Sequence, residues 1–277
     1  MTRIIAAISG GVDSVVLLDM LANSSDDEII VAHFDHGIRD DSASDATFVR
    51  GLASSYGYPF ETQRVELGPT ASEEKARNAR YAFLRSVAKK HDAHIVTAHH
   101  ADDAIETVAI NLHRGTGWRG LAVLDSDIRR PLLHLSKADL LNYAASHDLQ
   151  WREDSTNASD AYLRNRLRKH VHVLEDDAKR QLLALRSQQI DTKQKIDQEM
   201  SALVGSGPKY SRYFFTHVPL VVAVECLRYI TKARLTRPQL ERALLAIKTA
   251  GPKSSYHAGA GIAFDFTTRN FSLSLLK

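Results

Sequence analysis

The sequence predicts an α/β fold in which a parallel twisted sheet carries helices on both faces, followed by a small C-terminal α+β domain. Three observations lead to this prediction. Short apolar runs alternate with amphipathic helical segments through the first half of the chain. A glycine-containing turn joins the first apolar run directly to a helix. Ionisable residues follow the predicted strands, at the ends where open α/β sheets bind ligands.

The composition is that of an ordinary globular protein. The chain has 277 residues, 44% of them hydrophobic and 25% charged, which suits one large domain and a smaller one. Cys226 is the only cysteine, which excludes a disulfide or a cysteine-rich zinc site within the chain. We expect a cytoplasmic protein without a membrane partner, because the N-terminal apolar run resembles a core strand and no run is long enough to span a bilayer. A net charge of +3 permits a nucleic-acid partner without requiring one.

The N-terminal segment predicts a strand over residues 3–8 and a helix over 14–23. The turn between them contains two glycines, which let backbone N–H groups converge, and the helix N-terminus adds partial positive charge. Such a turn suits a phosphate group. Asp13 fits there if it holds Mg²⁺ between its carboxylate and the phosphates. The alternative is a serine-rich turn that only caps a helix.

The motif SGGVDS lacks the spacing of the Walker A and GxGxxG motifs. It resembles the pyrophosphate loop of enzymes that split ATP into AMP and pyrophosphate. That resemblance implies Mg²⁺ on Asp13 and ATP binding by all six loop residues: Ser9, Gly10, Gly11, Val12, Asp13 and Ser14. The motif alone leaves the acceptor of the adenylyl group open.

The second and third predicted strands span residues 29–34 and 60–67, with a helix over 45–56 between them. Asp35 follows the second strand within the motif HFDHGIR, either as part of the site or as a capping residue in a polar loop. Ser72 is the expected N-cap of a helix that runs to about residue 90.

Two arginines of that helix occupy unusual positions. Arg80 falls inside the apolar stripe and Arg77 lies at its edge. Either both side chains snorkel to solvent, or they are held to meet an acidic group or a substrate.

A fourth strand is predicted over residues 93–98, and it ends in the motif HHADDAIET, which begins at His99. Asp103 and Glu106 lie one turn apart on the following helix, on the side away from its apolar face. Two such carboxylates can bind Mg²⁺ or an ammonium group. A solvated acidic face is the alternative.

Two basic segments follow. Arg114, Trp118 and Arg119 stand among three glycines, which predicts a mobile loop that closes as a lid or stacks on a base. The run over residues 162–170 predicts either an exposed basic helix or a contact with a phosphate backbone, made by Arg164, Arg166 and Arg168.

The composition changes near residue 175, which predicts three parts. We expect an ATP-binding catalytic domain over residues 1–175, a connecting helix over 176–207 and a small domain over 208–277. The last part shows helical patterns over 220–231 and 237–249, then alternation typical of short strands over 254–276. Seventy residues give a thin core, so we expect this part to pack on another element.

Seven motifs occur in order over residues 3–175: SGGVDS, HFDHGIR, EEKARNARYAFL, TAHHADDAIET, HRGTGWRGL, RPLL and EDSTNASDAYLRNRLR. Together they resemble the tRNA(Ile)-lysidine synthase family. The resemblance implies the adenine-nucleotide α-hydrolase type of fold and a ligase of tRNA processing. In that reaction ATP adenylates the C2 oxygen of the wobble cytidine of an isoleucine tRNA and releases pyrophosphate. The ε-amine of L-lysine then attacks C2 and displaces AMP.

The resemblance also implies roles for the candidate residues. Asp103 and Glu106 would hold the lysine ammonium, while Arg80 or Arg77 would meet its carboxylate or order the acids. Asp13 would act through Mg²⁺. His99 and Asp35 are both candidates for the base that removes a proton from the lysine amine. Trp118 would stack on the base, and tRNA phosphates would be bound by Arg114, Arg119, Arg164, Arg166 and Arg168. The oligomeric state is left open, with a homodimer as one option.

Other readings compete with this one. The chain could be another ATP-dependent adenylating enzyme with a pyrophosphate loop, such as a different tRNA-modifying or amide-forming ligase. The thiolases of this class carry sulfur on cysteines or an iron–sulfur cluster, which Cys226 cannot do unaided. An ATP-dependent RNA-binding module without catalysis would leave Asp13 and the acidic pair unexplained.

Overall fold

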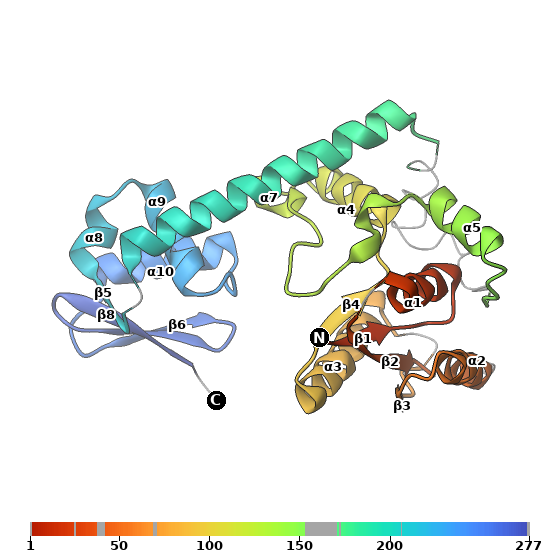
Figure 1. The fold of residues 1–277 in the computed structure, drawn as a ribbon. Helices are drawn as coiled ribbons and strands as arrows, with labels where there is room; N and C mark the ends of the chain where they lie inside the picture. The colour runs from red at the N-terminus through yellow and green to blue at the C-terminus, as the bar shows by residue number, and fades with distance from the viewer. Residues whose placement is uncertain are drawn as a thin grey trace. The chain divides into compact units, whose positions relative to one another are not determined.

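The fold comes from a computed structural model of the chain (Figure 1). The structure describes residues 2–24, 26–37, 42–68, 71–152, 171, 173–205 and 207–275. The chain divides into two compact units, Met1–Ile190 and Asp191–Lys277, and each is described by itself.

The N-terminal unit is built on a parallel sheet. Its described strands are β1 (Arg3–Ala7), β2 (Glu28–Asp35), β3 (Phe60–Arg64) and β4 (His94–Thr97), arranged in the order β3-β2-β1-β4. The chain steps outward from β1 to β3 and then returns to place β4 on the other side of β1. This reversal is a topological switch point, so the loops that leave β1 and β4 lie next to each other at the carboxyl edge of the sheet.

Helices cover both faces of this sheet, as the sequence predicts. Because strand side chains alternate, Ile4 and Ala6 of β1 face one way and Ile5 faces the other. The first face packs against α1 (Val12–Ser24), α2 (Ser42–Ser55) and α5 (Lys137–Ser146). The second face packs against α3 (Glu73–His91). Figure 1 shows α1 and α3 on opposite sides of the strands.

The helix boundaries agree with the local sequence signals. Ser72 accepts a hydrogen bond from the backbone N–H of Lys75 at 3.2 Å, so it caps α3 as predicted. Ser136 caps α5 in the same way, and Asp139 completes a capping box. The third strand is shorter than predicted, since it ends at Arg64.

The segment between α4 (Ala101–His113) and α5 is more regular than the predicted mobile loop. It contains two 3₁₀ helices, η1 (Trp118–Leu121) and η2 (Pro131–His134). The amide of Asn111 donates to the carbonyl of Gly120 at 2.5 Å, which ties η1 to the C-terminal part of α4. Residue 120 has to be a glycine, because a Cβ at this position would lie 2.5 Å from the Thr116 hydroxyl.

Helix α7 (Asp176–Val204) is the long helix predicted near this position, and the boundary between the two compact units falls inside it. Its first half belongs to the N-terminal unit, where Leu182 and Leu185 pack against Val108 of α4. Because the unit boundary lies at Ile190, the predicted division at residues 175 and 207 stays a prediction.

The C-terminal unit is an antiparallel sheet covered by short helices. Its strands are β5 (Lys209–Ser211), β6 (Ser255–Gly259), β7 (Ile262–Phe266) and β8 (Asn270–Leu275), in the order β5-β8-β7-β6. Its further helices are α8 (Arg212–His217), α9 (Leu220–Ile230) and α10 (Arg237–Thr249). The second half of α7 completes its core through Met200, which answers the expectation that this thin core packs on another element.

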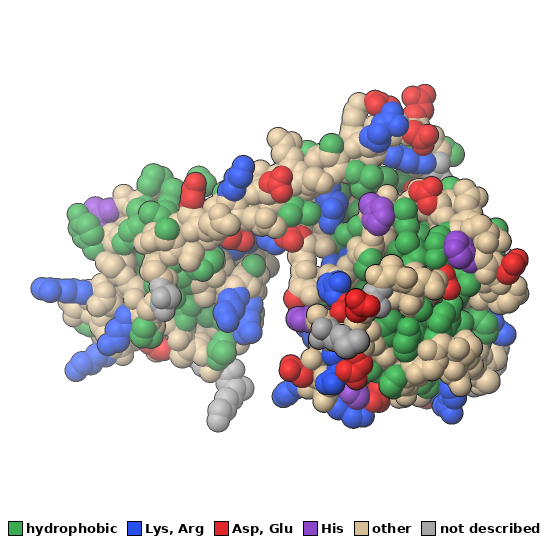
Figure 2. All heavy atoms as spheres, in the orientation of Figure 1, with side chains coloured by type: hydrophobic (Ala, Val, Ile, Leu, Met, Phe, Trp, Pro, Cys, Tyr) green, Lys and Arg blue, Asp and Glu red, His purple; other side chains and the backbone are tan. Residues whose placement is uncertain are grey.

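The C-terminal unit has a strongly basic surface. Residues 208–277 contain eleven Lys and Arg against three Asp and Glu. Figure 2 shows Lys and Arg side chains standing out from this unit. Exposed members include Lys232 and Arg234 between α9 and α10, and Arg237 at the start of α10. In the part of the chain that the structure describes, no helix is long and apolar enough to span a membrane.

Candidate active site

The turn after β1 is held in shape by Ser14. Its hydroxyl oxygen accepts the backbone N–H groups of Ser9 and Gly10 at 3.2 and 3.1 Å and donates to the Gly11 carbonyl at 2.8 Å. Gly10 has φ of +98°, a conformation that disfavours any residue with a Cβ. By helix geometry, the first N–H groups of α1, from Val12 and Asp13, have no intrahelical acceptor. The loop therefore offers backbone donors and the positive end of a helix to an anion.

Asp13 is the only carboxylate of this loop, and it pairs with a lysine 124 residues away. Its Oδ1 accepts from Nζ of Lys137 at 2.6 Å. The two side chains are 31% and 32% exposed, so both remain accessible from the edge of the sheet. Lys137 is the first residue of α5.

His100 lies behind this ion pair among three carboxylates. Its side chain is 2% exposed, and its ring nitrogens lie 3.5 to 3.8 Å from oxygens of Asp102, Asp103 and Asp13. Burial lowers the pKa of His100, but the contact with Asp102 and the charges of Asp103 and Asp13 outweigh burial, so the pKa is raised above 6.5. The imidazole therefore tends to carry a positive charge that offsets its acidic neighbours.

Asp102 connects this cluster to α5. Its Oδ2 accepts the backbone N–H of Lys137 at 2.7 Å. The contact with His100 and this backbone N–H together lower the pKa of the Asp102 carboxyl to about 2. A second backbone bond, from the Ala101 N–H to the Leu135 carbonyl at 2.8 Å, holds the same two segments together. The start of α5 is thus fixed against the start of α4.

Of the predicted acidic pair, Glu106 is buried and Asp103 is half-buried. Glu106 is 2% exposed and the Asp103 side chain is 18% exposed. Asp103 Oδ2 also accepts the backbone N–H of His100 at 3.0 Å, so it caps α4. The alternative of a solvated acidic face is therefore wrong. A buried carboxylate favours a cationic partner, because an uncompensated charge is costly away from water.

His99 faces a group of guanidinium ions. Burial lowers the pKa of His99 to about 4, and the charge of Asp103 opposes this shift. Three positive charges add to the lowering, those of Arg130, Arg80 and Arg77. His99 is therefore neutral near pH 7, and its Nδ1 lies 2.8 Å from the Thr97 hydroxyl.

Arg77 and Arg80 share Tyr81 as a neighbour. Their guanidinium carbons lie 4.9 and 5.3 Å from the centre of the Tyr81 ring. Arg80 is half-buried while Arg77 is exposed. Since both charges act on His99, the structure brings the predicted arginines and the predicted base to one region of the sheet edge.

Asp35 is placed by a turn and an arginine. Its Oδ1 accepts the Gly37 N–H at 2.9 Å, and its Oδ2 pairs with Arg64 at 3.1 Å. The Asp35 side chain is buried at the end of β2. These bonds give Asp35 a clear role in shaping the loop after β2. Its part as a base stays a prediction.

The predicted RNA-contacting residues lie at the other end of α4. Arg114 is the C-cap of this helix, and α4 rises about 1.5 Å per residue, so it stands roughly 16 Å from Asp103 along the helix. Trp118 follows in η1, where the guanidinium of Arg119 lies 4.6 Å from its ring centre. Stacking of Trp118 on the reacting base stays a prediction. Arg164, Arg166 and Arg168 lie outside the described residues.

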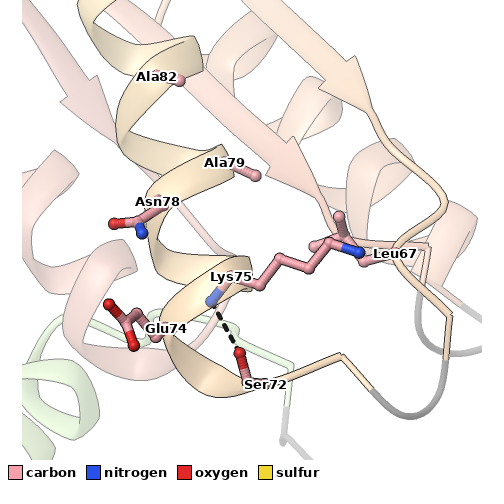
Figure 3. Close-up of a pocket in the computed structure, with 7 residues that line it drawn as sticks. All are labelled: Leu67, Ser72, Glu74, Lys75, Asn78, Ala79 and Ala82. Carbon is pink, nitrogen blue, oxygen red and sulfur yellow. Dashed lines mark hydrogen bonds between the residues drawn. The ribbon is translucent and has the colours of Figure 1, made fainter.

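A cavity of about 520 Å³ lies between Leu67 and the first turns of α3 (Figure 3). Its lining from α3 includes Lys75, Asn78 and Ala82, which share one face of the helix. At 3.6 residues per turn, Arg77 and Arg80 point to the opposite side. The cavity is therefore separate from the charged cluster.

Sequence reasoning missed Lys137, His100 and Asp102 as members of the site. His100 and Asp102 stand inside the motif HHADDAIET, so their burial was the missing information. For Lys137 the sequence offers one signal, a basic residue at the first position of a helix, where the dipole disfavours positive charge. Such a misplaced charge indicates a specific anionic partner.

The comparison with known families agrees with this geometry. Residues 1–175 match the sequence profile of the PP-loop domain. The chain belongs to the PP-loop family. The loop of that name corresponds to the turn after β1 that carries Asp13.

Curated relatives show which members of the family the chain is similar to. The chain is 35% identical to the tRNA(Ile)-lysidine synthase of Thermus thermophilus over 259 residues, covering 87% of this chain and 51% of the relative. It is 40% identical to that of Lactobacillus johnsonii over 183 residues, covering 61% and 42%. The chain thus spans about half the length of the curated relatives it matches.

Among solved structures, the U34-tRNA thiolase NcsA of Methanococcus maripaludis, determined with its [4Fe-4S] cluster, has a TM-score of 0.53. The identity is 16%, and the match covers 70% of this chain and 72% of the thiolase. This likeness concerns the fold alone. It confirms the predicted PP-loop type of α/β fold.

The donor set around Asp13 fits Mg²⁺ bound together with a phosphate. In the described ranges, no group of three or more His, Cys, Asp or Glu side chains is arranged to hold a metal ion by itself. Mg²⁺ is commonly bound by one or two carboxylates plus substrate phosphates and water. Asp13, beside a loop that favours phosphate, would supply that single carboxylate.

Proposed function

We propose that this chain catalyses the ATP-dependent ligation of L-lysine to C2 of the wobble cytidine of an isoleucine tRNA. ATP would first adenylate the C2 oxygen, which forms an O–P bond and releases pyrophosphate. The ε-amine of lysine would then attack C2, AMP would leave with the oxygen, and the amine would lose its proton. The similarity to lysidine synthases supports this substrate set, and the geometry of the charged cluster supports the order of events.

One observation carries the proposal: Asp13 of the nucleotide loop and Asp103 of the acidic pair both lie against the side chain of His100. Nε2 of His100 lies 3.8 Å from Asp13 and 3.6 Å from Asp103. A group adenylated at the loop would therefore stand next to an amine held by Asp103. Two sites so close suit a reaction in which one substrate is activated and the other attacks.

Within this proposal, the loop residues and the start of α1 bind the phosphates of ATP. Asp13 is the carboxylate suited to Mg²⁺, which when bound would stabilise the charge that develops on the leaving pyrophosphate. The Ser14 hydroxyl keeps Ser9 and Gly10 in the shape that directs the loop toward the phosphates.

Asp103 and Glu106 bind the lysine ammonium in this proposal, and Arg77 or Arg80 meets its carboxylate. The ammonium, with an ordinary pKa of about 10.4, must lose a proton before it attacks. Burial and the nearby guanidiniums favour the neutral amine, whereas the carboxylates of Asp103 and Glu106 favour the charged form. His99, which is neutral near pH 7, and Asp35, whose oxygens bond Gly37 and Arg64, both remain candidates for the general base.

The tRNA would be held through its phosphates. The basic C-terminal unit, with exposed Lys232, Arg234 and Arg237, offers one contact surface. Arg114, Arg119 and Trp118 offer another near the end of α4, and they would bind RNA beyond the reacting base. Replacing Lys232, Arg234 and Arg237 together by Ala should weaken tRNA binding and reduce the slope of its salt dependence by about 3.

The decisive experiment follows ¹⁴C-lysine into RNA with purified protein, ATP and an isoleucine tRNA that carries cytidine at the wobble position. We expect label on the tRNA only when ATP is present, and no label when uridine replaces that cytidine. Label without ATP, or on both tRNAs, would contradict the proposal. ATP cleavage without label on any RNA would point instead to another adenylating enzyme of the PP-loop family.

A second experiment tests the lysine site. The double variant Asp103→Asn, Glu106→Gln should raise the KM for lysine much more than the KM for ATP. Asp139→Asn is a matched control, because Asp139 caps α5 as Asp103 caps α4 yet lies exposed. Equal effects on both substrates would give the acidic pair a structural role instead.

A further inference from the structure

The ion pair between Asp13 and Lys137 has no explanation in packing alone. Both side chains are about a third exposed, and ion pairs of that kind contribute little to stability. Lys137 also stands where the helix dipole of α5 disfavours a positive charge. A lysine held in this position is better explained by an anion that arrives at the loop.

The backbone around Lys137 is fixed while its ammonium remains accessible. Its N–H is bound to Asp102 at 2.7 Å, and the capping box of Ser136 and Asp139 sets the start of α5. The ammonium itself reaches the carboxylate of the phosphate loop at 2.6 Å. Lys137 therefore presents its charge at the edge of the nucleotide loop without needing a loop movement to do so.

Asp13 cannot serve Mg²⁺ and Lys137 equally well with the same oxygen. A metal ion on Asp13 would compete with the ammonium for this carboxylate, because two cations repel each other at such a short distance. The displaced ammonium would then stand beside the metal-bound phosphates. A phosphate oxygen is the natural new partner for a lysine, which binds phosphate as a point charge.

We propose that Lys137 exchanges partners during nucleotide binding, leaving Asp13 and binding the β- and γ-phosphates of ATP. In this role it supports the pyrophosphate leaving group and keeps Asp13 neutralised until Mg²⁺ arrives. The inference rests on the proposed function only in that the loop binds ATP, because it concerns neither the tRNA nor the lysine substrate.

Equilibrium binding of nucleotides by the full chain, measured by calorimetry without tRNA or lysine, tests this exchange. Lys137→Met should weaken Mg·ATP about 10- to 100-fold, the worth of a charge-assisted hydrogen bond, and should leave AMP binding within twofold. Lys137→Arg should recover most of the ATP affinity. Lys90→Met is the control, because Lys90 forms a 2.7 Å pair with Glu61 away from the loop.

A second measurement removes the metal with EDTA. Asp13→Asn frees Lys137 from its carboxylate, so this variant should bind metal-free ATP more tightly than the parent protein while it binds Mg·ATP more weakly. Adding Lys137→Met to it should remove most of that tightening. Thermal melting of each variant confirms that it is folded.

The outcomes separate clearly. Equal losses of ATP and AMP affinity, or no loss of either, would overturn the exchange and give Lys137 a structural role. A parent protein that binds no ATP would overturn the proposed function together with this inference. ATP binding that depends on Lys137, without lysine transfer to RNA, would keep the inference and refute the acceptor.

Discussion

Asp19 offers a stringent test of how the phosphate-loop helix is held. The Asp19 carboxylate on α1 is 7% exposed. It accepts the hydroxyl of Tyr56 from α2 at 2.6 Å and the hydroxyl of Tyr143 from α5 at 2.8 Å. The amide of Asn23 adds a third donor at 3.1 Å. One buried charge thus ties together three helices on the same face of the sheet.

Removing the tyrosine hydroxyls should be costly, since a hydrogen bond to a charged group contributes about 1.5 to 3 kcal/mol. We expect Tyr56→Phe and Tyr143→Phe each to lower the free energy of unfolding by about 2 kcal/mol. The double variant should lose about 4 kcal/mol at pH 7.

Urea unfolding followed by the fluorescence of the two tryptophans, of which Trp151 packs against the same core, measures these changes. Tyr58→Phe is the control: its ring stacks on Tyr56 with centres 6.0 Å apart, and its hydroxyl has no hydrogen bond among the described residues. We expect that variant to stay within 0.5 kcal/mol of the parent, about the usual range for such changes. Losses below about 0.5 kcal/mol in both Tyr56→Phe and Tyr143→Phe would refute this account of Asp19.

Three further predictions concern other parts of the chain. Because burial lowers the pKa of His99 to about 4, the unfolded chain takes up a proton between pH 6.5 and 4 that the folded chain does not, so stability falls as the pH falls through this window. His99→Asn should flatten that part of the pH profile of urea midpoints, and an unchanged profile would assign the acid sensitivity elsewhere. Gly10→Ala places a Cβ on a residue with φ of +98°, 3.4 Å from Phe48, so it should lower stability by about 1 to 3 kcal/mol and weaken ATP binding. Gly57→Ala is the control: its φ is +72° and its Cβ would lie in open space, so it should lower stability without affecting ATP binding. Arg212→Ala removes three bonds to backbone carbonyls and should destabilise the C-terminal unit by about 3 kcal/mol in hydrogen exchange, with Arg212→Lys recovering little of it.

The sequence predicts the sheet and its first loop well because both follow from local rules. The apolar run that ends at Ser9 forms β1, and the hydrophobic hairpin over β7 and β8 forms with its turn at residues 267–270. Helix starts at Ser72 and Ser136 follow from capping chemistry within four residues. Periodicity and caps need no knowledge of distant contacts.

Contacts that join distant segments could not be predicted in this way. Lys137 and Asp13 are 124 residues apart in the sequence. No local sequence pattern predicts that β4 pairs with β1. The helical periodicity places Glu106 on the side of α4 away from its apolar face, but tertiary packing buries the side chain. The segment around Trp118 was expected to be mobile because of its glycines, yet the Asn111 amide fixes η1 to α4.

The balance of charge at the sheet edge explains why a metal ion and a nucleotide would bind together. Asp13, Asp102 and Asp103 bring three negative charges, Lys137 brings one positive charge, and the raised pKa of His100 favours a second. The cluster therefore keeps a net negative charge that repels free phosphates and attracts a cation. With Mg²⁺ on Asp13 the sign reverses, and the released Lys137 faces the phosphates. On this argument ATP should bind weakly without a divalent cation.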